Sequence, residues 1–298
     1  MKRTISAMRG KGSLSHNSRQ FIAENVDSSR TPLNIEYCNE DIRTVYHELF
    51  DDALARYNEK QTRKDRIIDD YYEKIRTGKQ EKLFEELIIQ VGNKDDMNAA
   101  SENGQLAQQI LDEYMRSFQQ RNPTLRVFSA HLHMDEATPH LHIDFIPFTT
   151  GSKRGLETRV SLKKALEALG FAGGTKSHTE LNQWIESEKQ VLASIMAQHD
   201  IEWEQKGTHE EHLSVLDYKK QERSKEVAAL ENQIDTLQEQ TAVAATALSE
   251  KQEQLDDIAP SPRRTVDAHG AAHHILTRRF LPKPRLRQPN RRLQIVFF

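Results

Sequence analysis

The sequence is poor in cysteine, in long apolar runs and in net charge. Its 298 residues include one cysteine, Cys38, so a fold built on disulfides within the chain is excluded. No segment approaches the roughly 20 consecutive apolar residues that a membrane-spanning helix needs. The first residues also lack the apolar core of a secretory signal peptide. These absences predict a cytoplasmic protein without a membrane span.

The charges nearly balance, with 42 basic and 45 acidic residues and a net charge of -3. This balance excludes a uniformly basic nucleic-acid-binding protein and a uniformly acidic disordered one. It conceals a basic segment, residues 260–298, which is rich in proline and arginine and has Asp267 as its one acid. We expect no packed structure there. The segment is either a basic arm that binds nucleic acid or a segment foreign to the rest of the chain.

Hydrophobic periodicity predicts an α+β domain over residues 1–205. Strands are expected at 1–9, 33–38, 86–91, 125–134 and 140–148, and helices at 41–75, 104–120, 161–169 and 178–199. A short connection joins the last two strands, so they should form a hairpin in a mostly antiparallel sheet. We expect the helices to pack on one side of this sheet.

A heptad pattern follows in residues 206–259. Apolar residues recur there at alternating steps of three and four: Leu213, Leu216, Val227, Leu230, Ile234, Leu237, Ala244, Leu248, Leu255 and Ile258. Such a seam, with some polar interruptions, is typical of a coiled coil and predicts a homodimer through residues 213–258. A single amphipathic helix packed on the domain would show a similar pattern.

The most informative segment is HMDEATPHLH, from His133 to His142. Alternate residues of a strand share a face, so His140 and His142 point the same way, and His133 meets them from the neighbouring strand. Three neutral imidazoles on one face form a good site for a divalent transition metal. Glu136 would complete the site or act as a base. The alternative is a surface hairpin that happens to be rich in histidine.

Two neighbours of this cluster have other candidate roles. His131 is expected on the same face, as are Val127 and Ser129, but a fourth imidazole would crowd the ligands. Asp144 shares the direction of His142 and is a candidate for orienting an imidazole through a hydrogen bond.

These residues resemble the Mob/Pre plasmid mobilisation and recombination proteins, the MobV-class relaxases. HMDEATPHLH is similar to the family's HLDExTPHLH motif, with Met134 where leucine is usual. HNSR, at residues 16–19, and the segment that begins at Glu24 resemble the family's HNxR…NxDxxRxxxN segment. The resemblance covers residues 1–215, whereas residues 260–298 have no recognised counterpart.

The resemblance implies a relaxase-type (HUH-like) sheet and an endonuclease that nicks one strand at a transfer origin, with Mn²⁺ or Mg²⁺ as its metal. His16 would be the nucleophile that joins the DNA 5′ phosphate, with Tyr37 and Tyr46 as alternatives. The DNA-binding residues that it suggests are Asn17, Arg19, Arg30 and Asn34. Supercoiled or single-stranded origin DNA and the conjugation machinery are the expected partners.

Basic residues flank the expected site in two clusters, residues 1–19 and 151–164, and suggest a local DNA groove in an otherwise acidic domain. Two other functions compete with the relaxase. One is a metallohydrolase, because HLHMDE partly resembles the HxHxDH motif. The other is a truncated, non-catalytic DNA-binding or coiled-coil partner in which the histidines are structural.

Overall fold

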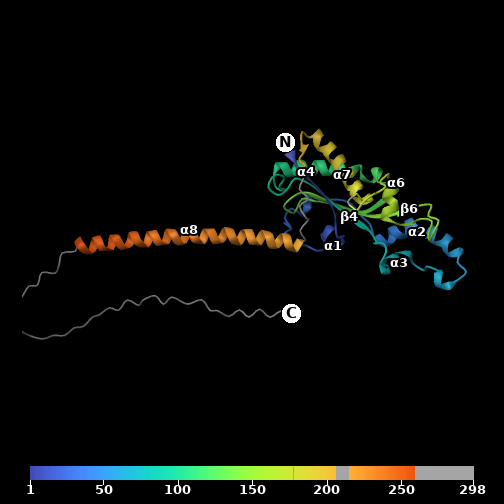
Figure 1. The fold of residues 1–298 in the computed structure, drawn as a ribbon, viewed down its shortest axis with the longest axis horizontal. Coiled ribbons are helices and arrows are strands. Elements are labelled where there is room, and N and C mark those ends of the chain that lie inside the picture. The colour runs from blue at the N-terminus through green and yellow to red at the C-terminus, as the bar shows by residue number, and fades with distance from the viewer. Residues whose placement is uncertain (177, 206–214, 259–298) are drawn as a thin grey trace, which may run out of the picture. The chain divides into compact units, whose positions relative to one another are not determined.

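The computed structural model describes residues 1–176, 178–205 and 215–258. The chain divides into two compact units, residues 1–209 and 210–298, which are considered separately (Figure 1). The basic segment 260–298 lies outside the described residues. In the described ranges no helix is both long enough and apolar enough to cross a membrane.

The first unit is built on an antiparallel sheet with the strand order β2-β4-β6-β5-β3. Its strands are β2 (Ile5–Arg9), β4 (Glu85–Val91), β6 (His140–Thr149), β5 (Leu125–His133) and β3 (Ile35–Asn39). The short β7 (Arg159–Val160) pairs with β6, and β1 (Lys2–Arg3) pairs in parallel with β8 (Glu202–Trp203). The predicted α+β class with a mostly antiparallel sheet is confirmed.

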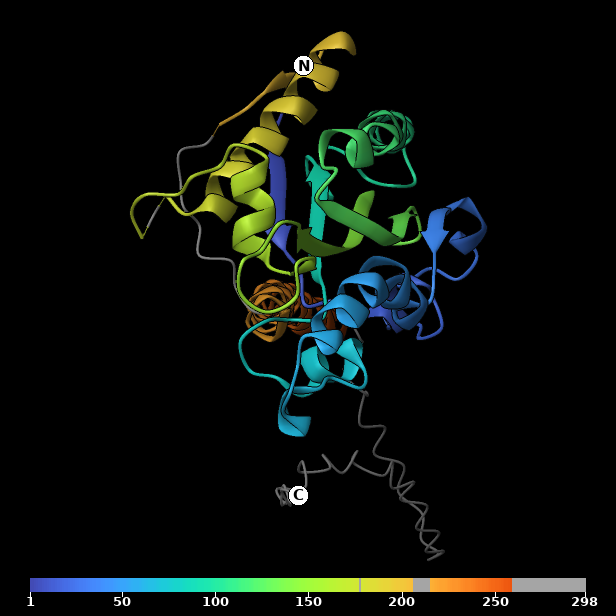
Figure 2. The same cartoon turned by 90° about the vertical axis from the view of Figure 1, so that its right-hand side faces the viewer.

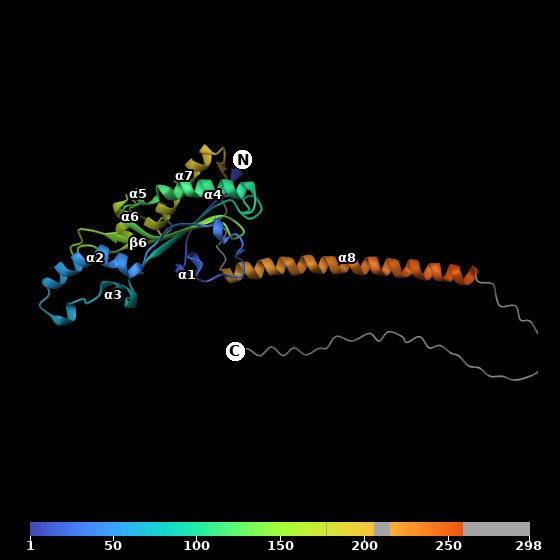
Figure 3. The ribbon, with the colours of Figure 1, turned by 180° about the vertical axis from the view of Figure 1, so that it is seen from behind.

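One face of the sheet carries the larger apolar core. Alternate residues of β4 and β6, among them Leu87, Ile89, Leu141 and Ile143, are at most 1% exposed. They pack under α4 (Glu102–Arg116), α5 (Phe118–Arg121), α6 (Leu162–Ala168) and α7 (Glu180–Gln198). Figure 3 shows α4, α6 and α7 together on this side of the strands.

The other face is shared by a second core and by polar residues. Phe128 and Ile146 point to this side and pack against α2 (Ile42–Glu59) and α3 (Tyr71–Thr77). Three short helical elements complete the part of the chain before β4: α1 (Leu14–Asn17), η1 (Thr31–Leu33) and η2 (Lys64–Arg66). Helices therefore cover both faces, not one as expected, and Figure 2 shows them on either side of the sheet.

The single helix expected over residues 41–75 is interrupted between α2 and α3. It begins as predicted at Asp41, whose side chain accepts a hydrogen bond from the Thr44 N–H. The Asn58 side chain then bonds both the N–H and the carbonyl of Ile68, which folds the intervening segment back. Asp70 caps α3 through the Glu73 N–H, and Gly78 ends it.

A β-bulge in β5 changes which residues face the histidines. The pairing with β6 shifts between Val127 and Ser129, so that Ser129 lies opposite Asp144 and Val127 opposite Phe145. Val127 joins the larger core, whereas Ser129 stays on the polar face. The expectation that both share one face is therefore wrong, because the extra residue of the bulge reverses the alternation.

The described residues of the second unit form a long helix, α8 (Val215–Ile258), which spans most of the heptad pattern. Apolar side chains of the predicted seam are exposed along it: Val227, Leu230, Ile234, Leu237, Leu248 and Leu255. The helix is therefore confirmed, and its partner remains a prediction.

Candidate metal centre

Four imidazoles converge on the polar face beside the β5–β6 turn. The ring centroids of His133, His140 and His142 lie 4.7–5.2 Å from one another. The pairing of β5 with β6 places them, because His133 lies directly opposite His140 and His131 opposite His142. His16, from α1, approaches to 5.8 Å from both His133 and His142. The structure thus brings together the three histidines expected to bind the metal and the expected nucleophile.

Each of the three expected metal ligands is held through one ring nitrogen. His133 Nε2 donates to the Asn17 carbonyl at 2.8 Å, and His140 Nδ1 donates to the Thr138 carbonyl at 2.8 Å. His142 Nδ1 lies 2.7 Å from Glu86 Oε1. A carbonyl or a carboxylate only accepts, so these contacts set the tautomer and leave the other ring nitrogen with a free lone pair.

The remaining nitrogens fit a metal ion. His133 Nδ1 and His142 Nε2 are buried and have no hydrogen-bond partner among the described residues. Unpaired buried acceptors cost free energy unless something else binds them. Candidate ligand atoms fall into two overlapping groups, His16–His133–His142 and His133–Glu136–His140, and the atoms of each lie within 4.8 Å of one another. Imidazoles fixed through their second nitrogen are the usual donors of such sites.

The Glu136 carboxylate occupies the middle of the cluster. Its Oε1 lies 3.3 Å from His16 Nε2, 3.8 Å from His133 Nδ1 and 3.8 Å from His140 Nε2. Arg19 Nη2 donates to the same oxygen at 2.9 Å. Burial alone would raise the pKa of Glu136, but the contact with His16 and the nearby His140 and Arg19 lower it well below its usual range. The group is therefore an anion at neutral pH.

Two histidines of the cluster, His133 and His140, resist protonation. Burial, followed by the neighbouring His142 and His140, lowers the pKa of His133 to about 2. Burial and His142 also lower the pKa of His140 to about 4, against the opposing effect of Glu136. Both imidazoles are therefore neutral at pH 7, as metal ligands must be.

His16 is held close to these groups by the loop that leads into α1. Gly10 and Gly12 let this loop lie against β4, because a Cβ at Gly10 would collide with the Glu86 carboxylate. Gly12 has φ +73°, and a Cβ there would meet the Phe84 ring. The His16 side chain is 22% exposed, so it is both placed in the cluster and accessible from outside.

Asp135 anchors the chain that surrounds His16. Its carboxylate accepts two hydrogen bonds from Arg19, at 2.6 and 3.0 Å, and one each from Thr31 and Asn34, both at 2.8 Å. Its backbone carbonyl accepts from the Asp27 N–H. Burial would raise the pKa of Asp135, but these bonds, led by that of Arg19, lower it to about 2.

The four residues expected to bind DNA have different surroundings. Asn17 is 1% exposed and donates to Glu86 and Asp144. Arg19 and Asn34 bind Asp135, and Asn34 also accepts from the Met134 N–H. The side chain of Arg30 has no hydrogen-bond or ion-pair partner in the described part of the chain. Of the two arginines in this set, Arg19 is therefore paired with acids, whereas Arg30 has no ion pair in the described residues.

Glu86 is the important residue that sequence reasoning missed. The candidate for orienting an imidazole was Asp144, but Asp144 bonds Asn17 and Ser129, and Glu86 holds His142 instead. Asp144 is fully buried, and burial and the charge of Glu86 raise its pKa to about 7. The only signal in the sequence was an acid at the start of an apolar strand.

Other candidates lie apart from the cluster's centre. His131 shares the polar face, but it belongs to neither group of candidate ligands, and its Nδ1 lies 3.8 Å from Glu36. The Tyr37 hydroxyl donates to Asp112, and the Tyr46 hydroxyl donates to the Leu83 carbonyl. Burial raises the pKa of both phenols.

The sequence matches the family model of the Mob/Pre plasmid recombination enzymes over residues 2–220, and the chain belongs to this family. No curated protein matches it. Among solved structures it is similar to the MobM relaxase domain bound to a 22-nucleotide oriT DNA of plasmid pMV158, a manganese-bound crystal structure at pH 5.5. That match has 22% identity, covers 74% of this chain and 99% of the other, and has a TM-score of 0.44.

The same relaxase domain bound to 26 nucleotides of that oriT is 20% identical over 72% of this chain and 99% of the other, with a TM-score of 0.39. The membership of this chain in the family rests on the sequence match over residues 2–220.

Proposed function

We propose that the protein is a metal-dependent DNA relaxase that nicks one strand at the transfer origin of a plasmid or mobile element. The observation that carries this proposal is the convergence of His16 and Glu136 on the three hairpin histidines. Membership of the plasmid recombination enzymes and the oriT-bound relaxase domains among similar structures support it. A cytoplasmic location and contact with conjugation machinery remain predictions.

His133, His140 and His142 would hold the metal, since each has one fixed nitrogen and one free to coordinate. Two of the similar relaxase structures are described as manganese-bound, which makes Mn²⁺ the first metal to test, with Mg²⁺ as the alternative. When bound, the metal would polarise the scissile phosphate and stabilise the charge that develops on its oxygens.

His16 is proposed as the nucleophile. The lone pair of its Nε2 would form a bond to the scissile phosphorus while the bond from phosphorus to the 3′ oxygen breaks; the 3′ oxygen takes a proton from water, and His16 releases its Nδ1 proton to water. Glu136 Oε1, 3.3 Å from Nε2, is placed to receive a proton that Nε2 carries before the attack, so that the tautomer with its proton on Nδ1 reacts. Arg19 Nη1, 3.3 Å from the same nitrogen, holds the ring in position. Tyr37 and Tyr46 are poorer candidates because burial raises their pKa values and their hydroxyls are bonded elsewhere.

The proposed roles of Asn17, Arg19 and Asn34 follow from their contacts. Asn17 and Asn34 fix His133 and the β5–β6 turn through their backbone and side-chain bonds. Arg19 links Asp135 to Glu136. We assign to these three the positioning of His16 and the ligands, and to Arg30 a direct contact with a DNA phosphate.

The test is a nicking assay on supercoiled DNA that carries the transfer origin of the protein's own element, with Mn²⁺ or Mg²⁺. We expect relaxation together with a protease-sensitive protein–DNA adduct. His16→Ala and His140→Ala should abolish both, whereas His47→Ala, on the exposed surface of α2, should retain them.

Other outcomes of this assay favour the competing functions. Nicking without an adduct would indicate a metallohydrolase. Binding without nicking in any metal would indicate a non-catalytic DNA-binding partner. Undiminished nicking by His16→Ala would exclude His16 as the nucleophile.

The second unit is proposed to form a homodimer through its heptad seam. Val227, Leu230, Ile234 and Leu237 are 52–59% exposed on α8, and a parallel or antiparallel partner helix would bury them. Light scattering of the full chain should give the mass of a dimer. Ile234→Asp together with Leu237→Asp should give a monomer, whereas Glu231→Gln should leave the dimer intact. A monomeric parent would contradict the proposal.

A further inference from the structure

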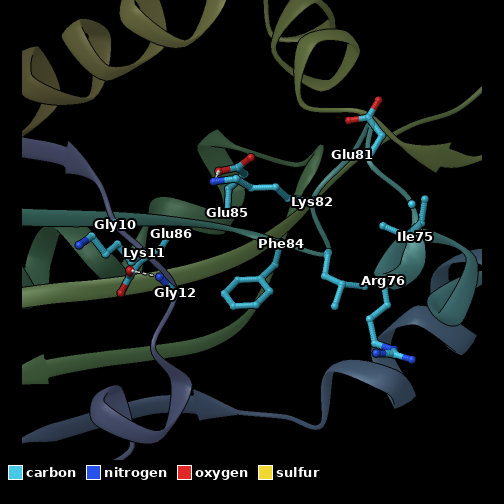
Figure 4. A pocket seen from close by; sticks show the side chains of 12 residues that line it. Gly10, Lys11, Gly12, Ile75, Arg76, Glu81, Lys82, Phe84, Glu85 and Glu86 are labelled. Carbon is cyan, nitrogen blue, oxygen red and sulfur yellow. Dashed lines mark hydrogen bonds and ion pairs between the residues drawn. The ribbon is translucent and has the colours of Figure 1, made fainter. Parts of the chain in front are cut away.

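Two adjoining cavities lie next to the metal centre, on the side of α3. The first has a volume of about 300 Å³ and extends from the loop at Gly10–Gly12 to the end of α3 (Figure 4). The second has a volume of about 500 Å³ and continues to the loop before β7. Ile75, Gly78 and Glu81 line both, so the two form one continuous depression.

The first cavity contains both basic and acidic side chains. Lys11, Arg76 and Lys82 line it and are exposed. Of its acids, Glu85 pairs with Arg9 and Lys82, Glu86 is bonded inward to His142, and both are at most 6% exposed, whereas Glu81 is partly exposed. Arg76 pairs with Glu73, so Lys11 is the cation of this cavity that has no ion pair among the described residues.

The second cavity is also basic. Lys74, Lys79, Arg154 and Arg159 line it, and Glu81 is its only acid. The side chains of Lys79 and Arg154, like that of Lys11, have no carboxylate within ion-pair distance in the part of the chain that the structure describes. Exposed, unpaired cations grouped around a depression attract phosphate groups.

An aromatic ring lies among these charges. Figure 4 shows Phe84 at the centre of the residues that line the first cavity, between Gly12 and Arg76. Its edge-to-face contact with Phe128, with centroids 5.3 Å apart, holds the ring in place. A basic groove that includes a fixed aromatic ring is typical of sites that bind a single nucleic-acid strand, because the ring stacks with a base.

The depression is directly connected to the metal centre through Glu86. Glu86 Oε2 accepts a hydrogen bond from the Gly12 N–H at 2.6 Å in the wall of the first cavity. Its Oε1 lies 2.7 Å from His142 Nδ1. One side chain therefore separates the cavity from a proposed metal ligand, and the loop of Gly12 continues into the helix that carries His16.

We propose that this depression binds the backbone of the single DNA strand on one side of the scissile phosphate. Lys11, Lys79 and Arg154 would contact successive phosphates, and Phe84 would stack with a base. This inference rests on the proposed nicking function, since it takes the scissile phosphate to lie at the metal centre. It assigns a function to residues that neither the histidine motif nor the HNSR motif includes.

The test compares single-stranded origin oligonucleotides that are extended step by step on the 5′ or the 3′ side of the nick site. Binding is measured by fluorescence anisotropy without metal, over a range of salt concentrations. We expect extension on one side only to increase affinity. The variant Lys11→Ala/Lys79→Ala/Arg154→Ala should lose this increase, and its plot of log affinity against log salt should be shallower by about 2, at roughly 0.7 per phosphate contact.

A control removes two positive charges from α4 and α7, the helices on the opposite face of the sheet, as Arg116→Ala/Lys189→Ala, and should behave as the parent. Phe84→Leu should weaken only the extended oligonucleotides. Equal effects of the cavity variant and the control variant, or an unchanged length dependence in the cavity variant, would overturn the inference. If the parent binds in this way but never nicks, the proposed nuclease function fails and the binding groove stands.

Discussion

The two faces of the β5–β6 hairpin are built from alternate residues of the same strands and differ completely. On one face, Leu132, Leu141 and Ile143 are 0% exposed and pack against helices. On the other, His131, His133 and His142 are also at most 5% exposed, yet each has a ring nitrogen without a hydrogen-bond partner among the described residues. The two faces are therefore similarly buried. They differ in that the apolar side chains are fully packed, whereas the imidazoles have ring nitrogens without hydrogen-bond partners in the described part of the chain.

The apolar face of the hairpin adds to the stability of the fold, whereas the histidine face reduces it. Burying an apolar side chain is favourable, whereas burying an unpaired imidazole nitrogen costs free energy. A short antiparallel hairpin lets both occur within one rigid element, so that the apolar face holds the imidazoles of the other face in position. In the absence of metal, the histidine face should be the less stable one.

The largest expected effect is on the apolar face. Ile143→Ala should lower the free energy of unfolding by about 4 kcal/mol, because it leaves a cavity in a close-packed core. Urea unfolding of the metal-free protein measures this loss. Ile22→Ala, at a position that is 54% exposed and outside the proposed dimer seam, should cost under about 0.5 kcal/mol. Equal losses at the two positions would contradict the apolar face as the source of stability.

The next effect is a pH dependence that belongs to the histidine face. The folded state lowers the pKa of His140 from 6.5 to about 4, so the folded state binds fewer protons than the unfolded state. The free energy of unfolding therefore keeps its full value above pH 6.5. As the pH falls towards 4, the protonation of His140 in the unfolded state lowers it by about 3 kcal/mol. Unfolding of the metal-free protein at pH 7 and pH 4 should show this loss.

His140→Gln should reduce this loss of stability on acidification, and the exposed His47→Gln should not. If both variants keep the full difference between pH 7 and pH 4, the pH dependence does not come from His140.

A smaller effect is expected from Glu86, which orients His142. Glu86→Gln should weaken Mn²⁺ binding about 10- to 100-fold, because the amide holds the imidazole less firmly and makes it a weaker donor. Isothermal titration calorimetry measures the affinity. Glu85→Gln is the matched control. Glu85 is the buried neighbour of Glu86, but its carboxylate pairs with Arg9 and not with a histidine. A similar loss in both variants would remove the specific role of Glu86.

The smallest effect is expected at His131. It belongs to neither ligand group, so His131→Leu should leave the Mn²⁺ affinity within about twofold of the parent. Replacing a buried imidazole that has an unpaired nitrogen should also raise the stability of the metal-free protein by about 1 kcal/mol. Calorimetry and urea unfolding test the two expectations. A marked loss of Mn²⁺ binding would make His131 a ligand.

Local patterns were sufficient to predict the hairpin and the meeting of its histidines. Alternation identified β5 and β6, and the short turn between them set the register that places His133 opposite His140. The same reasoning failed at Val127, because a bulge leaves no clear pattern in the sequence. It also failed between α2 and α3, where the Asn58 side chain ends the helix without a proline or glycine.

The contacts that complete the site were beyond such reasoning because they join distant parts of the chain. Glu86 reaches His142 only because β4 pairs with β6, and Asn17 reaches His133 across 116 residues. The order of strands in a sheet is not determined by the periodicity of any one of them. The family resemblance pointed to His16, but the role of Asp135 in holding Arg19, Thr31 and Asn34 emerged from the fold.

The most direct test is to identify the residue that becomes joined to DNA. The protein is incubated with Mn²⁺ and an origin oligonucleotide, digested with protease and nuclease, and analysed by mass spectrometry under conditions that preserve a bond between nitrogen and phosphorus. We predict a nucleotide adduct on His16 that is absent from His16→Ala and from His142→Ala. An adduct on Tyr37 or Tyr46, or efficient nicking with no adduct on His16, would contradict the proposed histidine nucleophile.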